Sequence, residues 1–340
     1  MKNNALILEG PKLGFSGTVQ SWEVINKDGS IARACYKPYS NLITNYGLST
    51  SLPYGNYNPW GSTLYMWRIT NYIAIGTGES EPTITDTRLG TEVFRGERMY
   101  TAYNAEAVTP PGGVDGQYYA TKTIGYQTNL GDLNHDITEI GFSHDSGFNS
   151  ASLFSKHRLK DEFGNPTSVR VNSNQQIRLK YILSIFATPL DTYTGSFALA
   201  GYSPETINYT AKWQEIKSVE EFGGILASFL YCSQLDLRRN VWTFQPIGTT
   251  ISNSGDRTTC RSSDFAVSSD GLGGYYAIRN YYIGTDAATW ADGTKSFGLF
   301  SDNNNNDTHL FWAANLDTPI LKPNTHRMSF RVKLSWGRTT

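Results

Sequence analysis

A glycine-rich turn that follows a β-like run is the first feature of this sequence with the potential for chemistry. The stretch YIAIGTGESEPTITDTRLGTEVFR spans residues 72–95 and contains the turn Gly76-Thr77-Gly78. A Walker-type phosphate loop needs a Lys directly after its last glycine, and a dinucleotide loop needs a third glycine that opens a helix. No Lys follows Gly78 here, and Glu81, followed by Pro82, stands where the third glycine would be. We therefore expect a turn that lets a strand double back, in which glycine supplies a positive φ, and no nucleotide site.

A group of metal-type ligands lies in the segment LNHDITEIGFSHDSG, residues 133–147: His135, Asp136, Glu139, His144 and Asp145. On an extended strand, His135 and Glu139 would lie about 13 Å apart. One ion cannot bridge that distance unless the strand bulges. The favoured interpretation is a set of polar residues that flank a short buried strand, ITEIGF.

The Asn-rich segment SDNNNNDTH, residues 301–309, resembles a calcium loop in its first positions only. Asp307 stands where an EF-hand loop has glycine, and Ala313 stands where it has its bidentate glutamate. An exposed loop is the better interpretation.

Evidence for nucleophilic catalysis is missing from the sequence. No Gly-x-Ser-x-Gly motif occurs, and Cys35, Cys232 and Cys260 stand far apart, as expected for free thiols in a reducing cytosol. The adjacent carboxylates Glu220 and Glu221 lie in a helix candidate and are expected to be solvated. We predict no catalytic residue, cofactor or metal, although carboxylates distant in sequence can meet, so a glycosidase stays an open alternative.

Aromatic residues are dense in GGYYAIRNYYIGTDAATW, residues 273–290. They could form a face that stacks on sugars or contacts a protein, and the favoured alternative is cross-strand packing in the core. The weak candidates for a binding site are Tyr275, Tyr276, Tyr281, Tyr282 and Trp290.

Composition argues against two classes of protein, nucleic-acid binders and membrane-inserted proteins. Charged residues make up 17% of the chain and the formal net charge is −1, so the chain lacks the overall basic footprint of a nucleic-acid binder. Apolar runs are far shorter than a membrane-spanning helix, and we expect no membrane insertion. The 21 Tyr, 16 Phe and 8 Trp suit strand packing and subunit interfaces.

Period-two alternation predicts the elements that position these residues. VQSWEVI, the turn Asn26-Lys27-Asp28-Gly29 and IARACY form a hairpin signature, and QIRLKYILSIFA (176–187) alternates apolar with polar residues. One helix is expected over 218–230. The predicted class is all-β, with antiparallel sandwich or jelly-roll-like domains and at most one or two short helices. Pro189 suggests two β-rich domains, residues 1–188 and 189–340.

Five segments follow one another in a characteristic order: NLITNYGL (41–48), YIAIGTGESEPTITDTRLGTEVFR (72–95), DITEIGFSHD (136–145), LFSKHRLK (153–160) and NSNQQIRLKYILSI (172–185). Their order resembles a domain of tailed-bacteriophage virion proteins of the tail-fibre or minor tail protein family. The resemblance covers roughly residues 41–187, with Phe142 in place of a usual Leu and Lys156-His157-Arg158 crowding a usual Arg.

The resemblance implies a structural domain assembled into a particle, with no catalytic residues. We expect a tail component (fibre, fibre adaptor, collar or baseplate) that contributes to assembly and host attachment and is not an enzyme. Its expected partners are copies of itself in a trimer or ring, other virion proteins, and a host-surface receptor or glycan. The protein would be made in the host cytoplasm and then join the virion. The alternatives are a carbohydrate-binding or carbohydrate-active β-protein and a head-decoration protein.

Overall fold

β-Strands dominate the structure. The computed structural model describes residues 7–51, 70–97, 118–188, 192–198, 206–213, 234–242, 244, 257–262, 267–283, 291–300, 310–325 and 328–339. Within these ranges the helical structure is short and includes the π-helix η1, Gly47–Ser51. The predicted all-β class is therefore confirmed. The helix expected over 218–230 lies outside the described residues. No helix in the described ranges is long and apolar enough to cross a membrane.

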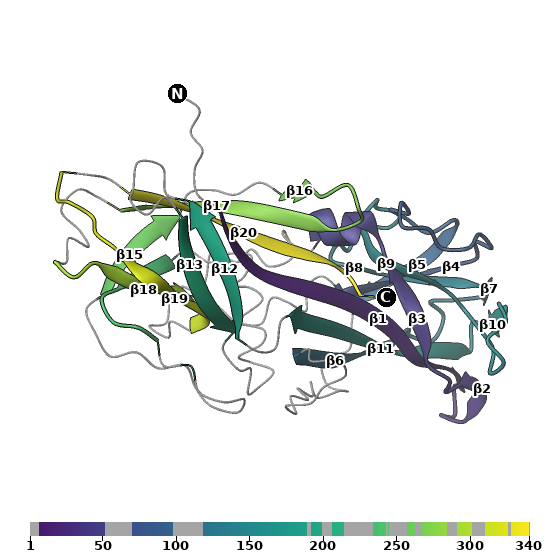
Figure 1. Ribbon diagram of the computed structural model, residues 1–340. Coiled ribbons are helices and arrows are strands. Elements are labelled where there is room, and N and C mark those ends of the chain that lie inside the picture. The colour runs from purple at the N-terminus through teal and green to yellow at the C-terminus, as the bar shows by residue number, and fades with distance from the viewer. Residues whose placement is uncertain are drawn as a thin grey trace.

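The long strand β1, Ile7–Asn26, organises the sheet (Figure 1). Along one edge it pairs antiparallel with β11, Gln175–Thr188. Three strands follow one another along its other edge: β20 (Met328–Arg338, parallel), β3 (Tyr39–Ile43) and β2 (Ile31–Cys35), the last two antiparallel. The β1–β2 pairing confirms the predicted hairpin, and Gly29 in its turn has a φ of 85°.

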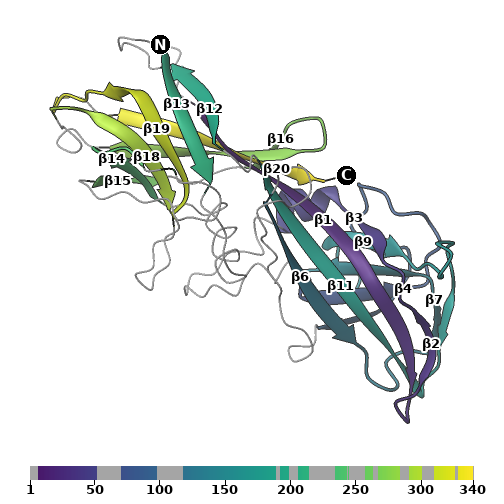
Figure 2. The same cartoon turned by 60° about the horizontal axis from the view of Figure 1, so that its bottom comes forward.

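A second sheet packs against β11 and its neighbour β6, Tyr118–Gln127 (Figure 2). Its strands lie in the order β3, β9 (Leu153–Arg158), β8 (Glu139–Ser143), β4 (Tyr72–Gly76) and β5 (Glu92–Glu97). The core between the layers includes Phe142 and Tyr181, whose rings stack with centroids 3.9 Å apart. The predicted alternation of β11 is confirmed, since its inward residues Ile177, Leu179, Tyr181 and Leu183 are all buried. β7 (His135–Ile137) and β10 (Val169–Val171) form a separate, two-stranded antiparallel sheet.

The remaining strands continue the main sheet through the second half of the chain. They lie in the order β12 (Tyr193–Ala198), β13 (Thr206–Trp213), β19 (Leu310–Ile320), β18 (Thr294–Phe300), β14 (Gln234–Arg238), β15 (Arg257–Ser262), β17 (Tyr275–Ile283) and β20. β16, Val267–Ser269, pairs with β17. The sheet curves back on itself, because Phe297 of β18 meets Phe330 of β20 with centroids 5.0 Å apart.

The division into residues 1–188 and 189–340 stays a prediction. β20 hydrogen bonds to β1, so one ladder joins strands from both halves.

Candidate functional site

The carboxylate of Glu139 is the centre of a buried polar cluster. Glu139 opens β8 and its side chain is 0% exposed. Its Oε1 accepts the backbone N–H of Gly78 at 3.0 Å and that of Thr91 at 3.1 Å. Both donors belong to the connection 77–91 between β4 and β5. The buried carboxylate therefore fastens this connection onto the sheet, and these two N–H groups are already engaged with the protein's own anion.

The glycines of the Gly76-Thr77-Gly78 turn allow the backbone to lie close to the carboxylate of Glu139. Neither Gly76 nor Gly78 has a positive φ, so our expectation on that point is wrong. A Cβ on Gly76 would lie 2.7 Å from Oε1 of Glu139, and a Cβ on Gly78 would lie 2.3 Å from the same atom. Only a residue without a side chain allows the backbone to come this close to the carboxylate. β4 is joined to its antiparallel neighbour β5 by the whole of residues 77–91 and not by a tight turn.

Lys156 supplies the cation of this cluster. It extends from β9, and its side chain is 3% exposed. Nζ lies 3.1 Å from Oε2 of Glu139 and 3.2 Å from Oδ2 of Asp86. Thr83 holds Asp86 in place by donating its N–H and its hydroxyl to the carboxylate. Burial opposes the ionisation of Asp86, but the hydrogen bonds from Thr83 and the charge of Lys156 outweigh burial and lower its pKa. We call these three residues the Glu139–Lys156–Asp86 cluster.

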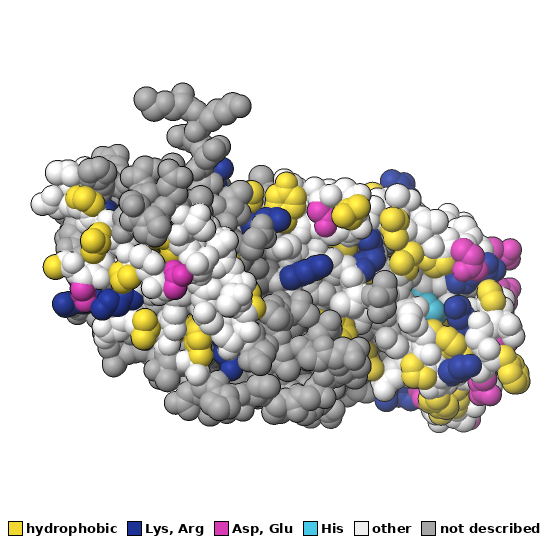
Figure 3. All heavy atoms as spheres, viewed as in Figure 1, with side chains coloured by type: hydrophobic (Ala, Val, Ile, Leu, Met, Phe, Trp, Pro, Cys, Tyr) yellow, Lys and Arg dark blue, Asp and Glu magenta, His cyan; other side chains and the backbone are white. Residues whose placement is uncertain are grey.

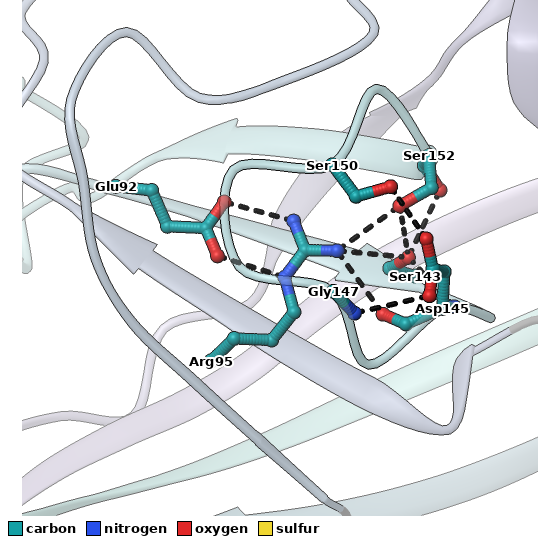
Figure 4. A network of polar contacts seen from close by, with 7 residues as sticks. All are labelled: Glu92, Arg95, Ser143, Asp145, Gly147, Ser150 and Ser152. Atoms are coloured by element: carbon teal, nitrogen blue, oxygen red, sulfur yellow. Dashed lines mark hydrogen bonds and ion pairs between the residues drawn. The ribbon is translucent and has the colours of Figure 1, made fainter.

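Arg95 organises a second polar network on β5 (Figure 4). Nε and Nη2 donate to the two carboxylate oxygens of Glu92, each at 2.8 Å. Nη1 donates to the carbonyl of Asp145 and to the hydroxyl of Ser152, both at 3.0 Å. Because Asp145 and Ser152 belong to the connection between β8 and β9, Arg95 ties that connection to β5.

The connection between β8 and β9 is also closed by its own side chains. Asp145 accepts the hydroxyl hydrogen of Ser150 and the N–H of Gly147, and these bonds lower its pKa. His144 stacks on Tyr46 with ring centroids 6.2 Å apart, and burial lowers the pKa of His144. These two predicted metal-type ligands thus have structural partners within the protein.

The metal-type ligands of residues 133–147 do not converge. His135 and Asp136 are exposed on β7 and precede the segment 137–142, which is buried throughout, so the interpretation of polar residues flanking a short buried strand is confirmed. Glu139 lies inside that buried segment. The strand breaks at Thr138. Within the described ranges, no three His, Cys, Asp or Glu residues are placed to hold one metal ion. The 301–309 loop and Cys232 lie outside the described residues.

His157 is a buried and uncharged side chain on β9. Its Nδ1 lies 3.1 Å from the carbonyl of Ser40, its ring stacks on Tyr39, and its Nε2 has no hydrogen-bond partner. Burial, with a smaller contribution from the charge of Lys160, lowers the pKa of His157 to about 4. The ring is therefore neutral at neutral pH.

The predicted aromatic candidates lie in different environments. Tyr281 is fully buried, Tyr275 and Tyr276 are half-buried, and Tyr282 is 54% exposed. Nζ of Lys333 lies 5.3 Å from the ring centre of Tyr276. Trp290 lies outside the described residues. Core packing accounts for Tyr281, while Tyr276 and Tyr282 stay candidates for a contact surface.

Comparison of the chain with models of protein families, with curated proteins and with solved structures finds no match.

Arg95, Lys156 and Asp86 were not among the predicted site residues. The segment LFSKHR contains a signal for Lys156, since a lysine inside a mostly buried strand needs a buried acid as its partner. Glu139, inside ITEIGF, is a second charge of the same kind. No local pattern identifies Asp86, because its connection carries no periodicity.

Proposed function

We propose that the chain is a structural component of a phage particle, part of its tail, which contributes to assembly and host attachment. The observation that supports this proposal is the meeting of the five resemblance segments in one packed unit.

Contacts link the segments in pairs. Thr44 of the first segment donates its hydroxyl to the carbonyl of Leu153 in the fourth at 2.6 Å. Gly78 of the second donates to Glu139 of the third. Phe142 of the third stacks on Tyr181 of the fifth. β8 of the third segment pairs with β9 of the fourth, so the five segments are parts of one packed unit.

The buried charged groups of this unit bind one another and the neighbouring backbone, which suits a structural role. The buried carboxylates of Glu139 and Glu92 bind neighbouring loops and cations of the same chain. Apolar, basic and acidic side chains are interspersed over the described part of the face in Figure 3. A mixed surface of this kind suits contacts with other proteins better than it suits a phosphate backbone.

The composition favours association with further copies of the chain. Aromatic side chains are enriched at subunit interfaces, and this chain contains 21 Tyr, 16 Phe and 8 Trp. We propose a homo-oligomer with closed symmetry, a trimer or ring, that also binds other virion proteins.

Immunogold electron microscopy of purified phage particles, with antibody raised against this chain, tests the proposal. Label on the tail or its appendages is the expected result. Label on the capsid would assign the protein to head decoration. Antigen confined to the lysate, with unlabelled particles, would contradict a structural role.

Carbohydrate binding is the second candidate function, because Tyr282 is a largely exposed aromatic ring on β17. A glycan array probed with the purified chain and with Tyr282→Ala tests it. Binding that the substitution abolishes would support a sugar-binding face, and such a face could serve host attachment on a tail protein.

A further inference from the structure

The Glu139–Lys156–Asp86 cluster places one amine within contact distance of two carboxyl groups. We propose that Lys156 and Asp86 become joined by an intramolecular isopeptide bond, with Glu139 carrying the protons of the reaction. The inference does not depend on a role in a phage particle.

The nucleophile and the electrophile are already in contact. Nζ of Lys156 lies 3.2 Å from Oδ2 of Asp86, one bond away from the carbon that it would attack. Proximity of this kind replaces a collision between free groups and lowers the barrier of a bond-forming step. The hydrogen bonds from Thr83 fix the Asp86 carboxyl group in place.

Glu139 is positioned as the proton carrier. Oε1 accepts both backbone N–H groups, so the carboxylate cannot turn away. Oε2 faces Nζ of Lys156 at 3.1 Å and accepts no hydrogen bond from any other described group. That oxygen is thus available for a proton from Lys156.

The charged pair is the resting state, because the hydrogen bonds from Thr83 and the charge of Lys156 lower the pKa of Asp86, and the neutral pair is a minor state that burial makes less costly. An ammonium and a carboxylate removed from water lose much of their hydration, and transfer of one proton between them produces a neutral pair. The side chains of Lys156 and Glu139 are 3% and 0% exposed, and that of Asp86 is 22% exposed. The neutral amine is a nucleophile, and the neutral acid is a better electrophile than its anion.

The step balances without any further reactant. The Lys156 ammonium gives one proton to the Asp86 carboxylate, and the resulting amine attacks Cγ of Asp86, which forms the new C–N bond. A second proton passes from nitrogen to Oε2 of Glu139 and on to the departing hydroxyl. The C–O bond breaks and water leaves. One ammonium and one carboxylate become one amide and one water, and Glu139 returns to its starting carboxylate.

The bond would connect two separate parts of the unit. Asp86 lies in the 77–91 connection and Lys156 lies in β9. A covalent link between them restricts the unfolded chain as a disulfide does, without depending on redox conditions.

Mass spectrometry of two matched variants of the full chain tests the inference. Lys156→Arg and Lys160→Arg have the same elemental composition when no cross-link is present. Lys160→Arg retains the reacting lysine, so we expect it to be lighter than Lys156→Arg by the mass of one water molecule. The unsubstituted chain should likewise be one water lighter than its sequence mass, and equal masses for the two variants would overturn the inference.

Peptide mapping and a third variant assign the atoms. After protease digestion, we expect a branched peptide that contains both Asp86 and Lys156. Glu139→Gln, with its fold checked by circular dichroism, should lose that peptide. A cross-link that formed at an unchanged rate in Glu139→Gln would overturn the role of Glu139, and a water loss at any other pair of residues would overturn the site.

Discussion

The guanidinium of Arg95 makes two parallel hydrogen bonds to the carboxylate of Glu92, each 2.8 Å long, and the two side chains are only 2% and 0% exposed. The pair lies on β5, and the remaining donor group of Arg95 reaches the β8–β9 connection. Its geometry therefore joins a strand to a loop that is distant in sequence.

Arg95→Lys should destabilise the protein by about 2–4 kcal/mol, because lysine cannot form the two-pronged pair and leaves Glu92 partly uncompensated. Chemical denaturation measures the loss. Arg170→Lys is the matched control, since Arg170 pairs with Asp136 at 3.5 Å and the two side chains are 47% and 64% exposed. That change should alter stability by no more than about 0.5 kcal/mol. Equal effects of the two substitutions would contradict the network.

Gly78→Ala should destabilise the protein by about 1–3 kcal/mol, because its Cβ would overlap Oε1 of Glu139 and force the connection away from the sheet. Gly337→Ala is the control, since the nearest atom to its Cβ is 3.6 Å away and its φ is not positive. Thermal unfolding of the two variants gives the comparison. A Gly78→Ala protein as stable as Gly337→Ala would show that the close approach is unimportant.

Acid should weaken the fold through His157. Its pKa is about 4 in the folded state against the ordinary value of 6.5, so the unfolded chain binds the proton more readily. The stabilisation that neutral His157 provides is complete above pH 6.5 and is lost as the pH falls toward 4, by about 3 kcal/mol in total. Denaturant titrations across this range should show a smaller slope with pH in His157→Gln. His135→Gln, at an exposed position, should keep the original slope.

Neighbouring tyrosines on β17 should respond in opposite ways. Tyr281→Ala empties a fully buried position and should destabilise the protein by about 3–5 kcal/mol, the range for large aromatic truncations. Tyr282→Ala removes a side chain that is 54% exposed and should change stability by less than about 1 kcal/mol. Urea unfolding distinguishes the two. A large loss in Tyr282→Ala would mean that its ring is part of the core.

Sequence periodicity predicted the strands well where one face is buried. The alternation in 176–187 corresponds to β11. Period-two patterns arise because one side of the strand packs on a core, and such patterns are local. The predicted hairpin is local too, since Asp28-Gly29 suffices to mark its turn.

The polar networks could not be predicted in the same way. Lys156 and Asp86 are far apart in sequence, and only the pairing of β8, β9 and β4 brings them together. The glycines of the 76–78 turn illustrate the same limit. A glycine can be required because the backbone has a positive φ or because another group lies too close for a side chain, and the sequence shows glycine in both cases. Distinguishing them requires the position of Glu139.

The order of strand partners along β1 also has a consequence for synthesis on the ribosome. The segment Ile7–Phe15 is translated long before β20, its neighbour on one edge. That stretch of backbone must wait until β20 has emerged before these hydrogen bonds can form. Nascent chains on neighbouring ribosomes can occupy the vacant edge in the meantime, so slow translation between the two segments would favour aggregation over native closure.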